Sequence, residues 1–431
     1  INLSEVCSRM AEFEMFIIDN AEADIPRLLL SCKDWPERKN LAISTIEARK
    51  KLRRKVPEWY SCPSLVYPSA LSAEQCSSSA TARYKASVAR SIAGGGKIAD
   101  LTGGIGIDSW AFAELFEEVL YNERESSLAD AARQNFRTLG VGNIKVSSVD
   151  VTPLSLGNIL DGFDPDLVFI DPARRSSDGR KVFLLEDCSP DVLKLLPGLL
   201  LRCRHLLLKL SPMADIAMTV ERLDRAWEEY LEKTSGTGWN GNWVREVHVV
   251  SSGGECKELL VWMDREWNGP YSLICNEDGA IMTFSQDEVR KAAPSLPESD
   301  YAGFLFEPGK SLTKAGVFNA LCGRFGLVKL GRATHLYTSG TGMPSVQTLD
   351  NLRPFGKLFE VRKVLPMNKA SFKEVRQSWP HSEVSARNIP LSSDELRSKL
   401  GVSSGEDAHI FGARVELPFA AGNYLFVCSR I

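Results

Sequence analysis

The sequence has few of the features that mark secreted, metal-binding or membrane proteins. Its ten cysteines form no CxxC pair and its five histidines stand far apart, which argues against disulfides and against a zinc site. No apolar run approaches the ~18 residues of a membrane-spanning helix. The net charge of −3 gives no overall attraction to nucleic acid or to anionic lipid. We therefore expect a cytoplasmic protein with reduced thiols, no membrane contact and no bound metal.

At 431 residues the chain is longer than one hydrophobic core usually serves, so several domains are expected. Residues 1–93 have helical segments broken by prolines. Residues 94–265 alternate short apolar runs with helical patterns, whereas the chain beyond 265 mixes loops with short strand-like pieces. The first two patterns predict a helical domain and an α/β domain, and the last predicts one or two small α+β modules.

The alternation in residues 94–265 predicts a parallel, doubly wound sheet. Two final runs, 244–250 and 255–262, flank Ser-Ser-Gly-Gly and predict an antiparallel hairpin. A parallel sheet that finishes with such a hairpin is a narrower class than a plain dinucleotide-binding fold. The five parallel strands are expected at Lys97–Thr102, Val119–Asn122, Ile144–Asp150, Leu167–Asp171 and His205–Leu210.

A glycine-rich loop, Asp-Leu-Thr-Gly-Gly-Ile-Gly-Ile-Asp at 100–108, joins the first strand to its helix. Gly103, Gly104 and Gly106 allow the backbone to approach a ligand, and the helix start offers free N–H groups. The next two strands close with carboxylates: Glu123 can accept hydrogen bonds from ribose hydroxyls, and Asp150 can reach an adenine amino group. These groups share one sheet edge, which predicts a nucleoside-bearing cofactor. The alternative is that the glycines only form a turn and that Glu123 and Asp150 are solvated acids at strand ends.

The spacing of the glycines bears on which cofactor this is. NAD would require Gly-x-Gly-x-x-Gly, but Ser109 stands at the third glycine position when the motif is counted from Gly104. The form Asp-x-x-x-Gly-x-Gly, from Asp100 to Gly106, instead resembles motif I of class I S-adenosylmethionine-dependent methyltransferases. The hairpin resembles the reversed last strand of that fold. The resemblance implies S-adenosylmethionine as the cofactor.

The fourth strand ends in Asp171-Pro-Ala-Arg174, which places charged residues directly after an apolar run. An amine nucleophile needs acceptors for its hydrogens, and Asp171 together with the Pro172 carbonyl can supply them. The stretch resembles motif IV of amine-directed methyltransferases, although Ala173 and Arg174 replace a proline and an aromatic residue. Guanine or another nitrogen therefore stays open beside adenine. Methylation at C5 of a pyrimidine ranks lower, because no cysteine nucleophile follows the fifth strand.

Two groups of cations have both a functional and a plain interpretation. Arg174, Arg175, Arg180 and Lys181 either hold phosphates beside the pocket or belong to a solvated loop. The segment 49–55, Arg-Lys-Lys-Leu-Arg-Arg-Lys, carries six positive charges in seven residues. It is either an RNA contact or the solvated face of a helix.

The combination of motifs resembles a bacterial family of class I methyltransferases. Besides the two motifs above, the resemblance rests on Glu74–Lys85, Gly254–Leu259, Phe304–Lys310, Lys314–Gly316 and Thr334–Ser339. It implies a helical domain (1–93), a methyltransferase domain (94–265), a ferredoxin-like module (266–320) and a THUMP-like domain (321–431). THUMP domains proper bind tRNA, so the architecture implies an RNA substrate, either tRNA or rRNA.

The resemblance also implies which residues form the site. Asp171 and Pro172 are expected at the reacting group. Ser79, Thr81 and Lys85 are expected to flank the methionine end of the cofactor, although a helix start capped by Ser or Thr explains the same pattern. The remaining cofactor contacts are expected from Asp100, Thr102, Gly103, Gly104, Gly106, Asp108, Glu123 and Asp150.

The leading hypothesis is an S-adenosylmethionine-dependent methyltransferase that acts on a base nitrogen of RNA. A methyltransferase acting on a small molecule or a protein is the first alternative. The second is an RNA-binding protein whose methyltransferase domain no longer catalyses. The sequence predicts neither the modified nucleotide nor the oligomeric state.

Overall fold

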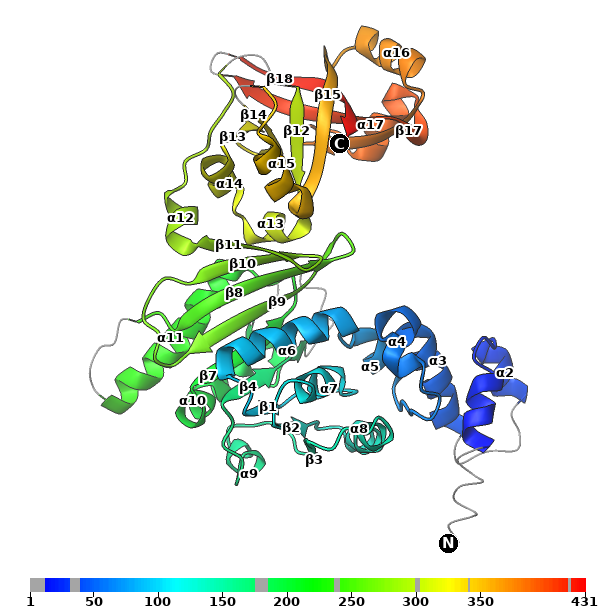
Figure 1. Cartoon of the computed structure of the whole chain (residues 1–431), viewed down its shortest axis with the longest axis vertical. Helices are drawn as coiled ribbons and strands as arrows, with labels where there is room; N and C mark the ends of the chain where they lie inside the picture. The colour runs from blue at the N-terminus through cyan, green and yellow to red at the C-terminus, as the bar shows by residue number, and fades with distance from the viewer. Residues whose placement is uncertain are drawn as a thin grey trace. The chain divides into compact units, whose positions relative to one another are not determined.

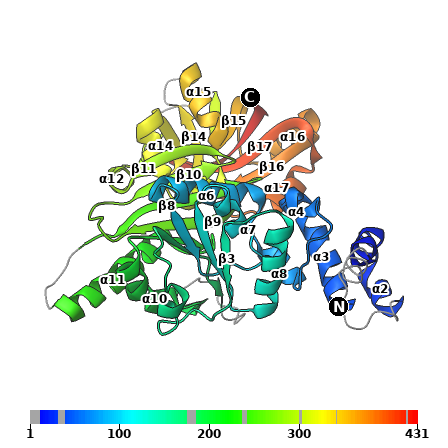
Figure 2. The same ribbon diagram turned by 60° about the horizontal axis from the view of Figure 1, so that its bottom comes forward.

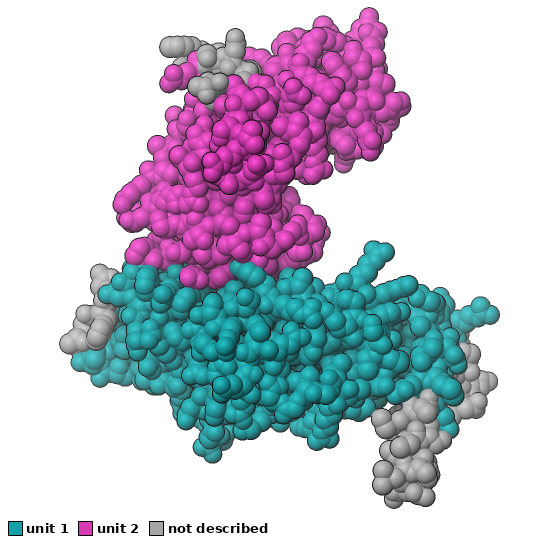
Figure 3. All heavy atoms as spheres, viewed as in Figure 1, with its two compact units in different colours: residues 1–245, 259–269 teal, residues 246–258, 270–431 magenta. Residues whose placement is uncertain are grey.

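The computed structural model describes residues 12–31, 39–174, 185–235, 241–298, 303–339, 342–417 and 420–431. The chain divides into two compact units, which Figure 3 shows in different colours. Unit 1 comprises residues 1–245 and 259–269, and unit 2 comprises residues 246–258 and 270–431.

Helices make up most of what the structure describes between residues 12 and 93. Five of these helices are α2 (Ile25–Ser31), α3 (Lys39–Lys55), α4 (Pro57–Tyr60), α5 (Ala70–Gln75) and α6 (Ser79–Ala93). The local sequence sets the ends of α6: Ser78 and Thr81 form a capping box at its start, and Gly94 ends it in the left-handed conformation. An apolar cluster that includes Ile17, Ile43 and Ile46 holds this region together.

The parallel strands of unit 1 lie close to their predicted positions. They are β1 (Lys97–Asp100), β2 (Glu118–Asn122), β3 (Ile144–Ser147), β4 (Leu167–Ile170) and β7 (His205–Leu210). Every residue of β4 is buried, as its run of apolar side chains predicts. Helices α7 (Ile107–Ala113) and α8 (Ser126–Thr138) pack beside β1–β3, and α10 (Val192–Arg202) packs on β7 and α11 (Ile216–Ser235) (Figures 1 and 2). The short elements between them are α9 (Leu156–Ile159), β5 (Ala173–Arg174), η1 (Leu185–Asp187) and β6 (Cys188–Ser189).

The sheet order confirms the predicted fold class. The nine strands run β11-β10-β8-β9-β7-β4-β1-β2-β3, where β8 is Val244–Ser252 and β9 is Glu255–Asp264. β9 pairs antiparallel with β7, so the parallel sheet is followed by the reversed hairpin that the sequence predicts. Two further strands, β10 (Ser272–Glu277) and β11 (Ala280–Ser285), follow β8 in the same sheet. The domain boundaries expected at 93, 265 and 320 stay predictions.

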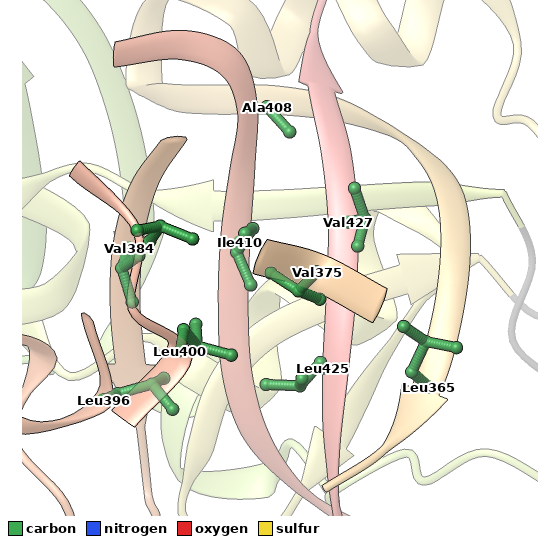
Figure 4. Packing of buried hydrophobic residues seen from close by; sticks show 10 residues of the cluster. Leu365, Val375, Val384, Leu396, Leu400, Ala408, Ile410, Leu425 and Val427 are labelled. Atoms are coloured by element: carbon green, nitrogen blue, oxygen red, sulfur yellow. The ribbon is translucent and has the colours of Figure 1, made fainter. Parts of the chain in front are cut away.

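Unit 2 contains a second sheet of seven strands in the order β13-β14-β12-β15-β18-β17-β16. Figure 4 shows one of its cores, in which Val375 of α16 (Lys369–Ser378) packs near Ile410 and Leu425 of the sheet. Leu396 and Leu400 of α17 (Ser393–Leu400) belong to the same core. The strands are β12 (Phe304–Pro308), β13 (Leu327–Gly331), β14 (Thr334–Ser339), β15 (Gly356–Pro366), β16 (His381–Arg387), β17 (Ser403–Leu417) and β18 (Ala420–Arg430). The helices are α12 (Gln286–Lys291), α13 (Lys310–Ala315), α14 (Phe318–Phe325), α15 (Val346–Leu352), η2 (Arg353–Phe355), α16 (Lys369–Ser378) and α17 (Ser393–Leu400).

Among the helices in the described ranges, none has the length and apolar character needed to cross a membrane. The eight cysteines in these ranges are free thiols. No cluster of three His, Cys, Asp or Glu side chains suited to a metal ion is found in the part of the chain that the structure describes.

Candidate active site

The candidate site lies where the central parallel strands of unit 1 end. β1 pairs with β2 on one side and with β4 on the other, and Asp100 is in register with both Tyr121 and Phe169. β4 continues the parallel pairing to β7, where Ile170 is in register with Leu208. The carboxyl ends of these parallel strands therefore lie at one edge of the sheet. From β1 the strand order runs to β2 and β3 on one side and to β4 and β7 on the other, so the direction of winding changes between β1 and β4. Open α/β sheets bind ligands at such a switch point.

The buried carboxyl group of Asp100 stabilises the glycine loop through hydrogen bonds. Its side chain is 1% exposed and accepts hydrogen bonds from Ser109 Oγ (2.6 Å) and from the Thr102 N–H (3.1 Å). Burial raises the pKa of Asp100 to about 7, and the nearby carboxylates of Asp108 and Asp171 add to this increase. In the structure, Asp100 therefore bonds to both ends of the loop.

The three glycines of the loop differ in what each requires. A Cβ at Gly103 would lie 2.1 Å from the ring of Tyr121, and one at Gly106 would lie 2.6 Å from the ring of Phe136. Gly104 has φ +55°, and a Cβ there would meet open space. Gly103 and Gly106 therefore make room for aromatic side chains of the core. Gly104 is the glycine of the loop beside which space remains for a ligand.

The N–H and carbonyl groups of Gly104 form hydrogen bonds with Tyr121 of β2 and with Glu123, the residue after β2. Glu123 accepts a hydrogen bond from the Gly104 N–H (2.9 Å) and another from the Glu125 N–H (2.9 Å). The hydroxyl of Tyr121 donates to the Gly104 carbonyl at 2.5 Å. The structure thus brings Glu123 and Gly104 together, as the predicted cofactor site requires. Tyr121 was not predicted as a site residue.

Asp150 is exposed beyond the end of β3. The buried Asn122 fixes the residue before it, because the Asn122 amide donates to the Val149 carbonyl (2.9 Å) and accepts from the Val149 N–H (3.1 Å). The Asp150 carbonyl accepts a hydrogen bond from Ser155 Oγ at 2.6 Å. Asn122 is a second residue that the sequence did not single out. Its signal is a buried amide at the end of an apolar strand.

Asp171 is fixed through its backbone and through its side chain. Its N–H donates to Thr102 Oγ1 at 2.7 Å, which ties the end of β4 to the glycine loop. Its Oδ2 accepts a hydrogen bond from the ammonium of Lys209 on β7, and the two groups form an ion pair. Pro172 is buried. Lys209 was not predicted, although a charge inside the run His-Leu-Leu-Leu-Lys-Leu is a visible signal.

Lys85 and Asp108, both predicted near the cofactor, meet in a buried cluster. The side chain of Lys85 is fully buried, and its Nζ lies 3.2 Å from Asp108 Oδ1. Ser77 Oγ accepts from Lys85 Nζ (2.8 Å) and donates to Asp108 Oδ2 (2.9 Å). This cluster joins α6 to the first turn of α7, directly after the glycine loop.

Ser79 and Thr81 are engaged in contacts of the helical region. Ser79 Oγ donates to Glu58 Oε2 at 2.6 Å. Thr81 belongs to the capping box with Ser78, as the plain interpretation of this stretch expects. Their role at the cofactor stays a prediction.

Arg175, Arg180, Lys181 and the side chain of Arg174 lie outside the described residues, so their contact with phosphates also stays a prediction.

The basic segment 49–55 makes many contacts inside the helical region. The guanidinium of Arg49 is buried and donates to the carbonyls of Tyr60 (2.7 Å) and Cys62 (2.9 Å). Arg53 pairs with Glu22, Lys51 pairs with Glu74, and Lys55 donates to the Glu74 carbonyl. These contacts favour a structural role for much of the segment.

Comparison with known proteins identifies the class and the family. A ferredoxin-like domain family matches residues 304–344, and a THUMP domain-like family matches residues 356–430. A crystal structure of a protein from Porphyromonas gingivalis W83, described as a methyltransferase, has a TM-score of 0.80 and 31% sequence identity, and the match covers 98% of each chain. An uncharacterized S-adenosylmethionine-dependent methyltransferase of Mycobacterium tuberculosis is 24% identical over 359 residues, which is 82% of this chain and 86% of the relative.

Together, the fold and these relatives define an S-adenosylmethionine-dependent methyltransferase of class I. The chain belongs to the bacterial family of the Porphyromonas gingivalis protein, with a methyltransferase domain followed by ferredoxin-like and THUMP-like domains.

Proposed function

We propose that this methyltransferase modifies an amine nitrogen of a base in RNA, either tRNA or rRNA. The observation that carries the proposal is Asp171, which is followed by Pro172 and is bonded through its backbone to Thr102 of the glycine loop. An acceptor for amine hydrogens therefore lies beside the loop that is assigned to the cofactor. Methyl transfer is an in-line displacement, so a fixed acceptor of this kind contributes chiefly by orientation.

The residues at the sheet edge fit S-adenosylmethionine in shape and in charge. Gly104 leaves open space beside the loop, and Glu123 next to it retains acceptor positions for ribose hydroxyls. Asp150, exposed at the end of the next strand, is assigned to the adenine amino group. Among the acids at this edge, the partly exposed carboxylate of Asp171 can also attract a positively charged sulfonium. The cofactor supplies the methyl group when it is bound.

At the acceptor, Asp171 and the Pro172 carbonyl hold the hydrogens of the amine so that the nitrogen lone pair faces the methyl group. The N–C bond forms as the C–S bond breaks, and the electrons of that bond stay on sulfur. The surplus proton leaves the nitrogen through Asp171 or through water. Such positioning predicts that removal of the carboxylate lowers the rate with little change in cofactor affinity.

Two observations on unit 2 support RNA as the acceptor. Residues 356–430 match the THUMP domain-like family. The same stretch exposes cations on β15 and α16, of which Lys363 pairs with Glu374: Lys357, Arg362, Lys363, Lys369 and Lys373. Exposed lysines and arginines bind phosphates with a salt-sensitive affinity, so this surface is the proposed RNA contact.

A small molecule or a protein is the second candidate for the acceptor. The net charge of −3 and the internal contacts of the basic segment 49–55 favour it, because both reduce the general attraction to RNA. Substrate binding would then be insensitive to salt. We propose a cytoplasmic location in either case.

The decisive experiment incubates the enzyme with S-adenosylmethionine carrying a labelled methyl group and with fractionated cellular RNA, protein and small molecules. Label in RNA, followed to a base nitrogen by nucleoside analysis, is the expected result. The Asp171→Ala variant should bind the cofactor normally and transfer the methyl group at least about a hundredfold more slowly. Label in protein alone would reject RNA, and normal turnover of the variant would reject the role of Asp171.

A further inference from the structure

Lys209 is the charged side chain of a buried strand. β7 has the sequence His-Leu-Leu-Leu-Lys-Leu, and Leu206, Leu207 and Leu208 are core residues. The Lys209 side chain is only 14% exposed. Removing an ammonium from water is costly unless a partner accepts its hydrogen bonds, so a lysine at this position requires a specific contact.

One such contact is the carboxylate of Asp171 at the end of the neighbouring strand. Lys209 Nζ donates to Asp171 Oδ2 across 38 residues of sequence, and β4 and β7 are paired in parallel directly before this point. The Asp171 N–H is held by Thr102 at 2.7 Å, which fixes the backbone that carries the carboxylate. With backbone and Oδ2 both held, the carboxylate has little freedom to rotate.

The carboxylate is nevertheless open on another side, because the Asp171 side chain is 34% exposed. Among the described residues, Lys209 on β7 forms an ion pair with it, and Asp100 on β1 lies near enough for the Asp171 carboxylate to raise the pKa of Asp100. Asp100, when ionised, repels the Asp171 carboxylate, whereas Lys209 attracts it. Of the side chains that the structure describes, Lys209 is therefore the cation paired with Asp171, and the pair holds the carboxylate in one orientation.

We propose that Lys209 is a positioning residue for methyl transfer: it holds one oxygen of Asp171 so that the rest of the carboxylate faces the acceptor amine. This inference rests on the proposed role of Asp171 in orienting the amine. Lys209 itself touches neither the cofactor nor the reacting nitrogen in this scheme. It acts by keeping an acceptor in line for the displacement, where small losses of alignment reduce the rate strongly.

The test compares Lys209→Met with Lys209→Arg in the full-length protein, using whichever cellular fraction takes up the labelled methyl group. Lys209→Met should lower kcat on the order of tenfold or more and leave the cofactor Kd, measured by calorimetry, within about twofold. Lys209→Arg, which keeps the charge and the donors, should recover most of the rate. Lys194→Met is the control, because this exposed lysine pairs only locally with Asp191; it should behave as wild type.

A second measurement separates positioning from a general structural role. Asp171→Asn keeps one acceptor oxygen but has no charge for Lys209 to attract, so its residual turnover is measurable. In that background Lys209→Met should change kcat by less than about twofold, because the interaction is already absent. An equal fold loss in both backgrounds would overturn the inference, and so would wild-type turnover of Lys209→Met.

The outcomes also distinguish this inference from the proposed function. If Asp171→Asn is impaired but Lys209→Met is not, only the role of Lys209 is wrong. If Asp171→Asn turns over as fast as wild type, the role of Asp171 fails and that of Lys209 fails with it. If the label enters protein instead of RNA, the RNA assignment fails. The kcat values of the Lys209 variants are then compared with the labelled protein as the methyl acceptor.

Discussion

At the scale of single residues, Asp100 has the most unusual chemistry. It is a carboxyl group without solvent access, and its pKa is raised from 3.8 to about 7 mainly by burial. Between about pH 4 and about pH 7 the folded protein therefore binds this proton while the unfolded chain releases it. The contribution of Asp100 to the free energy of unfolding therefore falls as the pH rises through this window and levels off above it.

Asp100→Asn tests this linkage. The variant should lose less stability than wild type between pH 5 and pH 8, because it lacks the titrating group. The measurement is urea unfolding of both proteins at the two pH values without cofactor. The exposed Asp161 provides the control variant, Asp161→Asn, which should follow wild type. If Asp100→Asn and wild type show the same pH dependence, Asp100 does not titrate in this range.

Residue chemistry also explains what the sequence could predict about the site. The glycine loop and its carboxylates are predictable because their order along the chain is a local pattern. The structure brings Asp100, Glu123 and Asp171 to one sheet edge. Lys209 is not predictable in this way, because its partner lies 38 residues earlier in the chain. A pair of that kind becomes visible only when the neighbours of each strand are known.

At the scale of elements, the start of α7 depends on α6 through the pair of Lys85 and Asp108. Both groups are largely removed from water, with side-chain exposures of 0% and 12%. Removing one partner of a buried pair leaves an uncompensated charge, whereas removing both is often close to neutral. The pair therefore contributes most as a link that fixes where the glycine loop enters its helix.

Lys85→Met should lower the free energy of unfolding by about 3–5 kcal/mol, since Asp108 then stays buried with one hydrogen-bond donor, Ser77. Adding Asp108→Asn should restore a large part of this loss, because the unpaired charge disappears. Chemical denaturation of the two variants and wild type measures both effects. A double variant no more stable than Lys85→Met would show that the loss comes from packing and not from charge.

The strands also show which features of the fold can be predicted from the sequence and which cannot. The positions of β1, β4 and β7 follow from apolar runs with clear boundaries, and they agree with the structure to within two residues. The pairing of β10 with β8 could not be predicted in this way. A short strand carries no signal for which sheet it joins, because that choice depends on exposed strand edges far away in sequence.

At the scale of the whole molecule, charge is distributed unevenly. A chain with a net charge of −3 that binds RNA must do so through local patches. The segment 49–55 is the densest run of cations in the sequence, but much of it is engaged within the helical region. The cations of β15 and α16 are exposed, although Lys363 pairs with Glu374, and they belong to the stretch that matches the THUMP domain-like family. They are therefore the better candidates for binding phosphates.

The double variant Lys369→Glu, Lys373→Glu on α16 tests this surface. Lys369 lies in the first turn of the helix, where a carboxylate is compatible with the helix dipole, so the fold should persist. RNA affinity should fall, and the slope of log K against log salt should decrease by about 0.7–0.9 for each phosphate that the protein no longer binds. The matched control is Arg225→Glu, Lys233→Glu on the exposed face of α11, which should keep the slope of wild type apart from a small general repulsion. Equal slopes for both double variants would mean that α16 binds no phosphate, and the case for RNA would then rest on the labelling experiment alone.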